Sequence, residues 1–227
     1  MALTITRASP DDLPALAEIN RLAYCRETIA QFAFTDWPDD KNMFQFFKAR
    51  LAERFEHPDT QVFKAFDTAT STISGFVCLT HEKGKQTENG PQEPAANITP
   101  TAKIMMQLPS YMSQEFVMKS GAEIEEMKAL MGDGEHYYVS AFAVEPRCQG
   151  KGTGSQLLKH CLDIADQASL QTWLISFPGS HSLYLRFGFR DVDYRDTDLG
   201  AWDKGKLRGY GVYRQYAMVS ILKELGF

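Results

Sequence analysis

Three glycines at alternate positions, Gly150, Gly152 and Gly154, lie between an apolar stretch and an amphipathic stretch of the chain. Because glycine has no Cβ, a loop of this composition can bring bare backbone N–H groups against an anion. The first turn of a helix adds unpaired N–H donors and a partial positive charge. The spacing therefore predicts a binding loop for a phosphate or pyrophosphate group at the start of a helix.

Two common phosphate-binding patterns do not fit this loop. The Walker A pattern G-x-x-x-x-G-K-[ST] fails because Gly152 follows Lys151 and no glycine lies five positions before Gly150. The dinucleotide pattern G-x-G-x-x-G, counted from Gly150, fails because its last position is Ser155. A tight strand-to-helix turn without a ligand would need one glycine, whereas three are present.

The segments around the loop alternate between expected strands and an expected helix. An apolar strand over 137–144 enters the loop, an amphipathic helix leaves it and ends near 168, and a second strand covers 170–176. This order predicts two parallel strands joined by a right-handed crossover. Strict alternation along the first strand would place one group of side chains on one face and a second group on the other. The two groups are Tyr138, Ser140 and Phe142, and Tyr137, Val139, Ala141 and Ala143.

The remaining periodicity predicts further strands and helices around this unit. Before it we expect a strand, two helices and a β-hairpin, at 3–8, 13–23, 40–55, and 61–67 with 72–81. After it we expect a short helix, a strand, a polar loop and a last strand, at 182–187, 189–194, 196–208 and 210–222.

Residues 1–227 are expected to form one domain with an inserted loop and helical segment at about 82–134. The first part, 82–102, is rich in proline, glycine and polar residues and predicts an exposed loop. The second part, 104–131, is helical in character, with interruptions at Pro109 and Gly121. It holds six of the nine methionines. These indicate either ordinary packing or an adaptable wall over a binding site.

The overall composition excludes several classes of partner. The net charge of -5 gives no electrostatic reason to expect a nucleic acid or a membrane as a partner. The four cysteines stand alone, which predicts neither a metal site nor a disulfide framework. Because no apolar leader and no run of about 18 apolar residues is present, we expect a cytoplasmic protein.

The glycine loop also matches a third pattern. Gln149-x-x-Gly152-x-Gly154 resembles the Q/R-x-x-G-x-G/A signature of the GNAT superfamily of acyl-CoA-dependent N-acetyltransferases. Tyr184, followed by Gly188 and Phe189, is similar to a second conserved stretch of that family. The order of elements agrees over most of the chain outside 82–134.

This resemblance implies an α/β (α+β) fold with a mixed, mostly antiparallel sheet. It further implies a central parallel βαβ unit and a V-shaped splay between the fourth and fifth strands. Acetyl-CoA would be the co-substrate, and no metal is implied. The backbone of Phe142, Ala143 and Val144 would pair with the pantetheine arm. The pyrophosphate would bind Gln149, Gly150, Lys151, Gly152, Thr153, Gly154 and Ser155, with the helix beginning at Ser155.

The same resemblance assigns two catalytic groups. The N–H of Val144 would donate to the thioester carbonyl and stabilise its oxyanion. Tyr184 would protonate the leaving thiolate, since a phenol is neutral at neutral pH. Relatives with a base on the fourth strand carry Glu or His on the face that here holds Tyr138 and Ser140. Glu135 and His136, just before or at the start of that strand, would have to act through water.

The acceptor pocket implied by the fold is expected between the first two helices and the later strands. Its candidate lining residues are Phe32, Phe34, Asp36, Trp37, Tyr138 and Ser140. Carboxylates near aromatic rings would suit a cationic amine. The alternative is that the aromatic residues are ordinary core and that the aspartates, including Asp39 and Asp40, belong to a surface turn.

These features predict transfer of an acetyl group to the primary amine of a small molecule, by direct attack in a ternary complex. The first alternative is acetylation of a protein lysine or N-terminus, which would need an open groove. The second is a module that binds CoA without catalysis. The intact glycine motif and Tyr184 favour an enzyme. The oligomeric state has no sequence signal.

Overall fold

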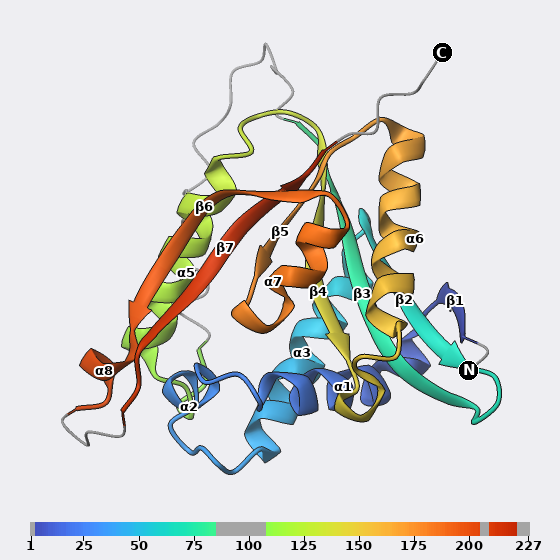
Figure 1. Ribbon diagram of the computed structural model, residues 1–227. Coiled ribbons are helices and arrows are strands. Elements are labelled where there is room, and N and C mark those ends of the chain that lie inside the picture. Colours follow the sequence, from blue (N-terminus) through green and yellow to red (C-terminus); the bar gives the residue numbers. More distant parts are fainter. Residues whose placement is uncertain (1–2, 85–107, 205–208, 222–227) are drawn as a thin grey trace, which may run out of the picture.

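The computed structural model describes residues 3–84, 108–204 and 209–221 (Figure 1). Its centre is a seven-stranded sheet in the order β1-β2-β3-β4-β5-β7-β6. The strands are β1 (Leu3–Arg7), β2 (Thr60–Asp67), β3 (Thr72–Glu82), β4 (His136–Val144), β5 (Thr172–Ser176), β6 (Phe189–Asp198) and β7 (Val212–Ser220). Neighbouring strands are antiparallel except for the pair β4–β5. The predicted mixed sheet with a parallel βαβ unit is confirmed.

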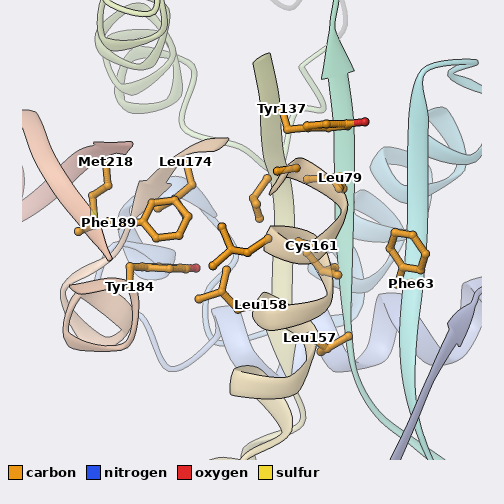
Figure 2. Packing of buried hydrophobic residues seen from close by; sticks show 14 of the residues in the cluster. Phe63, Leu79, Tyr137, Leu157, Leu158, Cys161, Leu174, Tyr184, Phe189 and Met218 are labelled. Atoms are coloured by element: carbon orange, nitrogen blue, oxygen red, sulfur yellow. The ribbon is translucent and has the colours of Figure 1, made fainter. Parts of the chain in front are cut away.

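Helices cover both faces of this sheet (Figure 1). They are α1 (Leu13–Tyr24), α2 (Ala30–Ala33), α3 (Lys41–Glu56), α5 (Gln114–Ala129), α6 (Thr153–Ala168), α7 (Pro178–Arg186) and α8 (Leu199–Trp202). On one face, α6 buries Leu157, Leu158 and Cys161 against β2, β3 and β5 (Figure 2). On the other face, α1 and α3 pack on β2, β3 and β4 through Leu16 and Leu51.

The strand β4 contains a bulge at Ser140. In its pairing with β3, Val139 lies opposite Leu79 and Ala141 lies opposite Cys78, so one residue of β4 is extra. A bulge reverses the face on which each later side chain lies. Val139 therefore packs with α6, as Phe142 does, whereas Ala141 packs on the α1 and α3 side.

The expected faces of β4 were therefore wrong beyond the bulge. Phe142 does not share a face with Tyr138, and Ala141 and Ala143 do not share one with Val139. Strict alternation fails here because it assumes a regular strand, and the apolar residues on either side of Ser140 suit both faces.

The strands β4 and β5 separate soon after they meet. Their pairing consists of Tyr137 with Thr172 and Tyr138 with Trp173. Beyond these pairs, β4 continues along β3 as far as Val144, and β5 continues along β7 as far as Ser176. Figure 1 shows the two strands diverging, with α7 between them in that view. The predicted splay between the fourth and fifth strands is confirmed.

The inserted segment is described from residue 108 onward, so most of the expected 82–102 loop lies outside the described residues. The helix α5 runs through Gly121, and the expected interruption at this position is wrong. A Cβ on Gly121 would meet nothing within 4 Å, so the glycine is not required by packing. Glycine inside a helix costs about 1 kcal/mol, which lowers helix stability without ending the helix.

A second core lies where α2, α3, α5, α8 and the start of β7 converge, and we call it the aromatic cluster. Its buried members are Ile29, Ala30, Phe32, Ala33, Phe34, Met43, Phe47, Met112, Phe116, Leu199 and Tyr213. Backbone bonds from Thr35 to Tyr111 and from Ser113 to Ala33 attach the segment before α5 to α2. The described part of the inserted segment, from residue 108 onward, is thus part of the folded body.

The region between the last two strands also differs from its expected form. β6 continues to Asp198 instead of ending near 194, and α8 lies inside the expected polar loop. Cross-strand partners explain the length of β6, since Arg214 of β7 forms a bidentate ion pair with Asp196. Charged pairs of this kind support a strand that lacks an apolar pattern.

Candidate active site

The glycine loop adopts the backbone conformation that its sequence demands. Gly150 has φ 73° and Gly152 has φ 89°, in the region that side-chain-bearing residues rarely adopt. A Cβ at either position would meet nothing within 4 Å, so backbone conformation rather than crowding requires glycine there. The helix α6 begins at Thr153 rather than at Ser155, two residues earlier than expected.

The loop contacts the end of β4 through a hydrogen bond, and it packs closely against β4 and α7. The side chain of Gln149 donates to the carbonyl oxygen of Val144 at 3.1 Å. A Cβ on Gly154 would lie 3.4 Å from Phe142 and 3.5 Å from Leu183. The hydroxyl of Thr153 is buried without a hydrogen-bond partner among the described residues. Open glycines at a helix N-terminus next to an orphaned hydroxyl fit a pyrophosphate group.

The edge of β4 that faces β5 is available beyond Tyr138. The N–H of Glu145 donates to Ser74 of β3 at 2.9 Å. Because successive N–H groups of a strand point to opposite sides, the N–H of Val144 points away from β3 and toward the gap. This edge can pair with an extended ligand in the manner of an added strand.

Tyr184 lies on α7 at the side of the same gap. Its ring is 6.1 Å from that of Phe142 and 5.7 Å from that of Phe189, and the side chain is 4% exposed. Figure 2 shows its phenol oxygen pointing from α7 toward α6. Burial raises the pKa of Tyr184 above its ordinary value, while a hydrogen bond with Ser180 acts in the opposite direction. The phenol is therefore neutral and able to donate a proton.

The candidates Tyr138 and Ser140 lie on β4 near an arginine that the sequence analysis missed. The ring of Tyr138 stacks on Trp173 at 4.4 Å. Arg54 of α3 donates to the carbonyl oxygen of Ser140 at 2.8 Å and to its hydroxyl at 3.3 Å. Thr80 also donates to that hydroxyl, at 3.2 Å. The bulge is therefore held by a cation, and its side chains offer no basic group.

The aromatic candidates Phe32 and Phe34 lie inside the aromatic cluster, 8% and 1% exposed, and Trp37 is partly buried against it. Asp36 accepts a hydrogen bond from Asn42 at 2.6 Å through one oxygen. Its other oxygen is buried and has no partner among the described residues. These residues contact one another and the inserted segment, while Tyr138 and Ser140 contact Trp173 and α3.

The two neighbouring aspartates have structural partners. Asp39 accepts from the N–H of Lys41 at the start of α3, at 3.0 Å, and Asp40 pairs with Arg21 of α1. These contacts agree with the surface-turn interpretation of both residues.

Glu135 and His136 lie at the closed end of the β4–β5 pair. A carboxylate oxygen of Glu135 lies 2.7 Å from Nε2 of His81, and Nδ1 of His136 forms a hydrogen bond with the carbonyl oxygen of Gly134 at 2.8 Å. Phe142 lies six positions after His136, which is roughly 20 Å along an extended strand. This distance places both groups far from the glycine loop.

A carboxylate that the sequence analysis did not single out lies at the open end. Glu27 follows α1 in a turn and accepts a hydrogen bond from the hydroxyl of Tyr213 at 2.6 Å. Its other oxygen lies 3.7 Å from the position of a Cβ on Gly179, the second residue of α7. The sequence carried no signal for this contact, because the partners are 186 positions apart.

Comparisons with known proteins agree with this fold. Residues 115–189, from α5 to the first residue of β6, match the model of the Acetyltransferase (GNAT) family. The matched stretch includes the glycine loop and Tyr184, so this part of the chain is similar to that family. No curated protein sequence matches the chain significantly.

Solved structures with the same fold span several acceptor classes. One is a histone acetyltransferase HPA2 and related acetyltransferase from Corynebacterium glutamicum, with 16% identity, full coverage of both chains and a TM-score of 0.60. A mosquito arylalkylamine N-acetyltransferase like 5b has 17% identity over 97% of this chain and 100% of its own, with a TM-score of 0.60. The PaiA N-acetyltransferase from Thermoplasma acidophilum, in complex with coenzyme A, has 15% identity over 97% and 99%, with a TM-score of 0.51.

Two further findings concern the described part of the chain alone. No helix there is both long enough and apolar enough to cross a membrane. The same residues contain no group of three or more His, Cys, Asp or Glu side chains that could hold a metal ion.

Proposed function

We propose that the protein transfers an acetyl group from acetyl-CoA to the primary amine of a small molecule, by direct attack in a ternary complex. The observation that carries this proposal is the departure of β4 from β5 after Tyr138, beside a glycine loop with open positive-φ positions. Such a gap gives the two substrates access to one point of the sheet.

On the donor side, the proposal assigns the pyrophosphate to the backbone of 149–155 and the pantetheine arm to Phe142, Ala143 and Val144. Acetyl-CoA supplies an activated acetyl thioester when bound. The N–H of Val144 would stabilise the oxyanion that develops on the carbonyl; one oxyanion-hole donor contributes about 3–4 kcal/mol in a hydrolytic enzyme with a similar tetrahedral intermediate. Tyr184 would donate its proton to the departing sulfur.

On the acceptor side, a small molecule is favoured by the aromatic cluster. The cluster joins α2, the segment before α5 and the start of β7 into one packed body at the open end of the gap. This body supports a bounded site, with Tyr138 and Ser140 on its β4 side and Asp36 and Trp37 at its α2 side.

The experiment is a panel assay with the full chain. Acetyl-CoA is mixed with primary amines in one series and with histone and ribosomal peptides in another, and free CoA is followed with a thiol reagent. We expect CoA release and an acetylated product with small amines. Release with peptides alone would replace the proposal by protein acetylation. CoA binding without release in either series would indicate a binding module.

A further inference from the structure

The turn after α1 brings a carboxylate to the start of α7. One oxygen of Glu27 accepts the hydroxyl of Tyr213, and the other lies near Gly179, three residues after the end of β5. The site of Glu27 is therefore at the open end of the gap between β4 and β5. Glu135, in contrast, pairs with His81 at the closed end.

Three aromatic side chains lie next to one another on this side of the carboxylate, beginning with Tyr213, which donates to it. Tyr24 lies 6.1 Å from Phe177, and Phe177 lies 6.1 Å from Tyr213, measured between ring centroids. A carboxylate next to aromatic side chains can attract an ammonium group by ion pairing, and the neighbouring rings can add cation–π attraction. The arrangement matches the charge of an unreacted alkylamine.

The phenols that face Glu27 stay neutral. Burial raises the pKa of Tyr24 and that of Tyr213, and the negative charge of Glu27 raises both further. Gly179 contributes no charge from α7. The carboxylate of Glu27 therefore lies beside two phenols that keep their protons, and it accepts a hydrogen bond from one of them, Tyr213.

We infer that Glu27 binds the ammonium group of the acceptor and removes its proton before the nitrogen attacks the thioester. This inference rests on the proposed function. It supplies the base that Tyr138 and Ser140 do not provide, since Arg54 occupies the polar atoms of the bulge at Ser140.

Two protons leave the ammonium nitrogen during the reaction, and one proton is added to the sulfur of CoA. The ammonium gives one proton to Glu27, and the neutral nitrogen forms a bond to the acetyl carbon. The carbon–sulfur bond then breaks, and the thiolate takes a proton from Tyr184. The nitrogen loses its second proton, which restores the phenol through solvent, and Glu27 releases its own proton to water.

The test compares two acceptors of the same shape. One is the best alkylamine of the panel, which is protonated at neutral pH because its pKa is about 10. The other is its isostere in which oxygen replaces the adjacent CH2, an O-alkyl hydroxylamine whose nitrogen is already neutral. Glu27→Gln should lower kcat/KM for the alkylamine by about 10²- to 10³-fold, the range expected for loss of a general base.

The same substitution should affect the hydroxylamine about tenfold less than the alkylamine, since no proton must be removed first. Glu18→Gln, on the outer part of α1 beside Arg21, is the matched control and should leave both rates unchanged. Calorimetry with CoA present gives a second readout, in which Glu27→Gln should weaken alkylammonium binding while CoA binding is unchanged.

Equal losses for both acceptors, or no loss, would overturn the role of Glu27 while leaving the proposed function intact. A wild-type protein that acetylates no amine would instead refute the proposed function. In that case, alkylammonium binding that is the same in the wild type and in Glu27→Gln would overturn the binding role as well.

Discussion

The two sides of the gap between β4 and β5 are built in different ways. On the proposed donor side, one continuous stretch, 142–155, contributes backbone N–H groups and the first turn of α6. On the acceptor side, side chains come from α1, α2, α3 and α5, and from β4 and β7. Binding of a ligand by backbone N–H groups requires glycine at fixed positions, so such a site leaves a pattern in the sequence. A site that binds its ligand through side chains from distant segments leaves no such pattern.

The bulge at Ser140 links the two sides. It turns Phe142 toward α6 and Tyr184, while Tyr138 stays against Trp173 on the other side of the sheet. Arg54 holds the bulge from α3, so an element of the acceptor side fixes the strand that the donor would pair with.

The largest expected effect is on the donor side. Tyr184→Phe should lower kcat by about 10²- to 10⁴-fold, because the leaving thiolate loses its acid. The dissociation constant of acetyl-CoA, measured by calorimetry, should stay the same. Tyr194→Phe, at a half-exposed position of β6, is the control and should change neither quantity. An unchanged kcat in Tyr184→Phe would remove the acid role.

The pH dependence of kcat gives a second test of Tyr184 as the acid. Because burial raises the pKa of Tyr184, its acid form persists as the pH rises through the ordinary tyrosine value of about 10. The wild-type kcat should therefore show no fall assignable to Tyr184 below that pH. A fall that disappears in Tyr184→Phe would contradict the raised pKa.

The next effect concerns stability on the acceptor side. Phe34 is 1% exposed and contacts four aromatic rings, so Phe34→Ala should lower the free energy of unfolding by about 3–5 kcal/mol. Denaturant unfolding measures this loss. Truncation of the exposed Leu130 to alanine should cost about 0.5 kcal/mol or less. A stable Phe34→Ala protein with a raised acceptor KM would mean that Phe34 lines the acceptor site instead.

The smallest expected effect tests the glycine loop. Gly152→Val forces a β-branched residue into positive φ, which costs about 1–2 kcal/mol and should weaken acetyl-CoA binding by about tenfold or more. Gly132→Val carries a similar backbone penalty at φ 68°, in open space away from the loop. It should lose comparable stability but bind acetyl-CoA normally. If the two variants bound acetyl-CoA equally well, the glycine loop would not be part of the acetyl-CoA site.

Much of the local structure on the proposed donor side followed from the sequence. The alternate glycines, the apolar strand before them and the amphipathic helix after them are local patterns, and each predicts its own structure. The splay also followed, through the family resemblance. The bulge at Ser140 did not, because the residues around it are apolar or small on both faces and alternation gives no sign of the extra residue.

Most of the structure on the proposed acceptor side could not be predicted from the sequence. The four-residue helix α2 and the helix α8 are too short to show periodicity, and both are fixed by packing in the aromatic cluster. The sequence around Glu27 is typical of the end of a helix. Its contact with Tyr213 exists because the fold of the sheet brings the turn after α1 next to β7. Long-range contacts of this kind are set by topology.

The central claim is that the donor adds to the free edge of β4 beside the glycine loop. Amide hydrogen exchange with and without CoA tests it most directly. On binding, the N–H groups of Phe142 and Val144 should become strongly protected, while that of Glu145, already bonded to Ser74, should change little. CoA binding that leaves Phe142 and Val144 exchanging at their original rates would contradict the account.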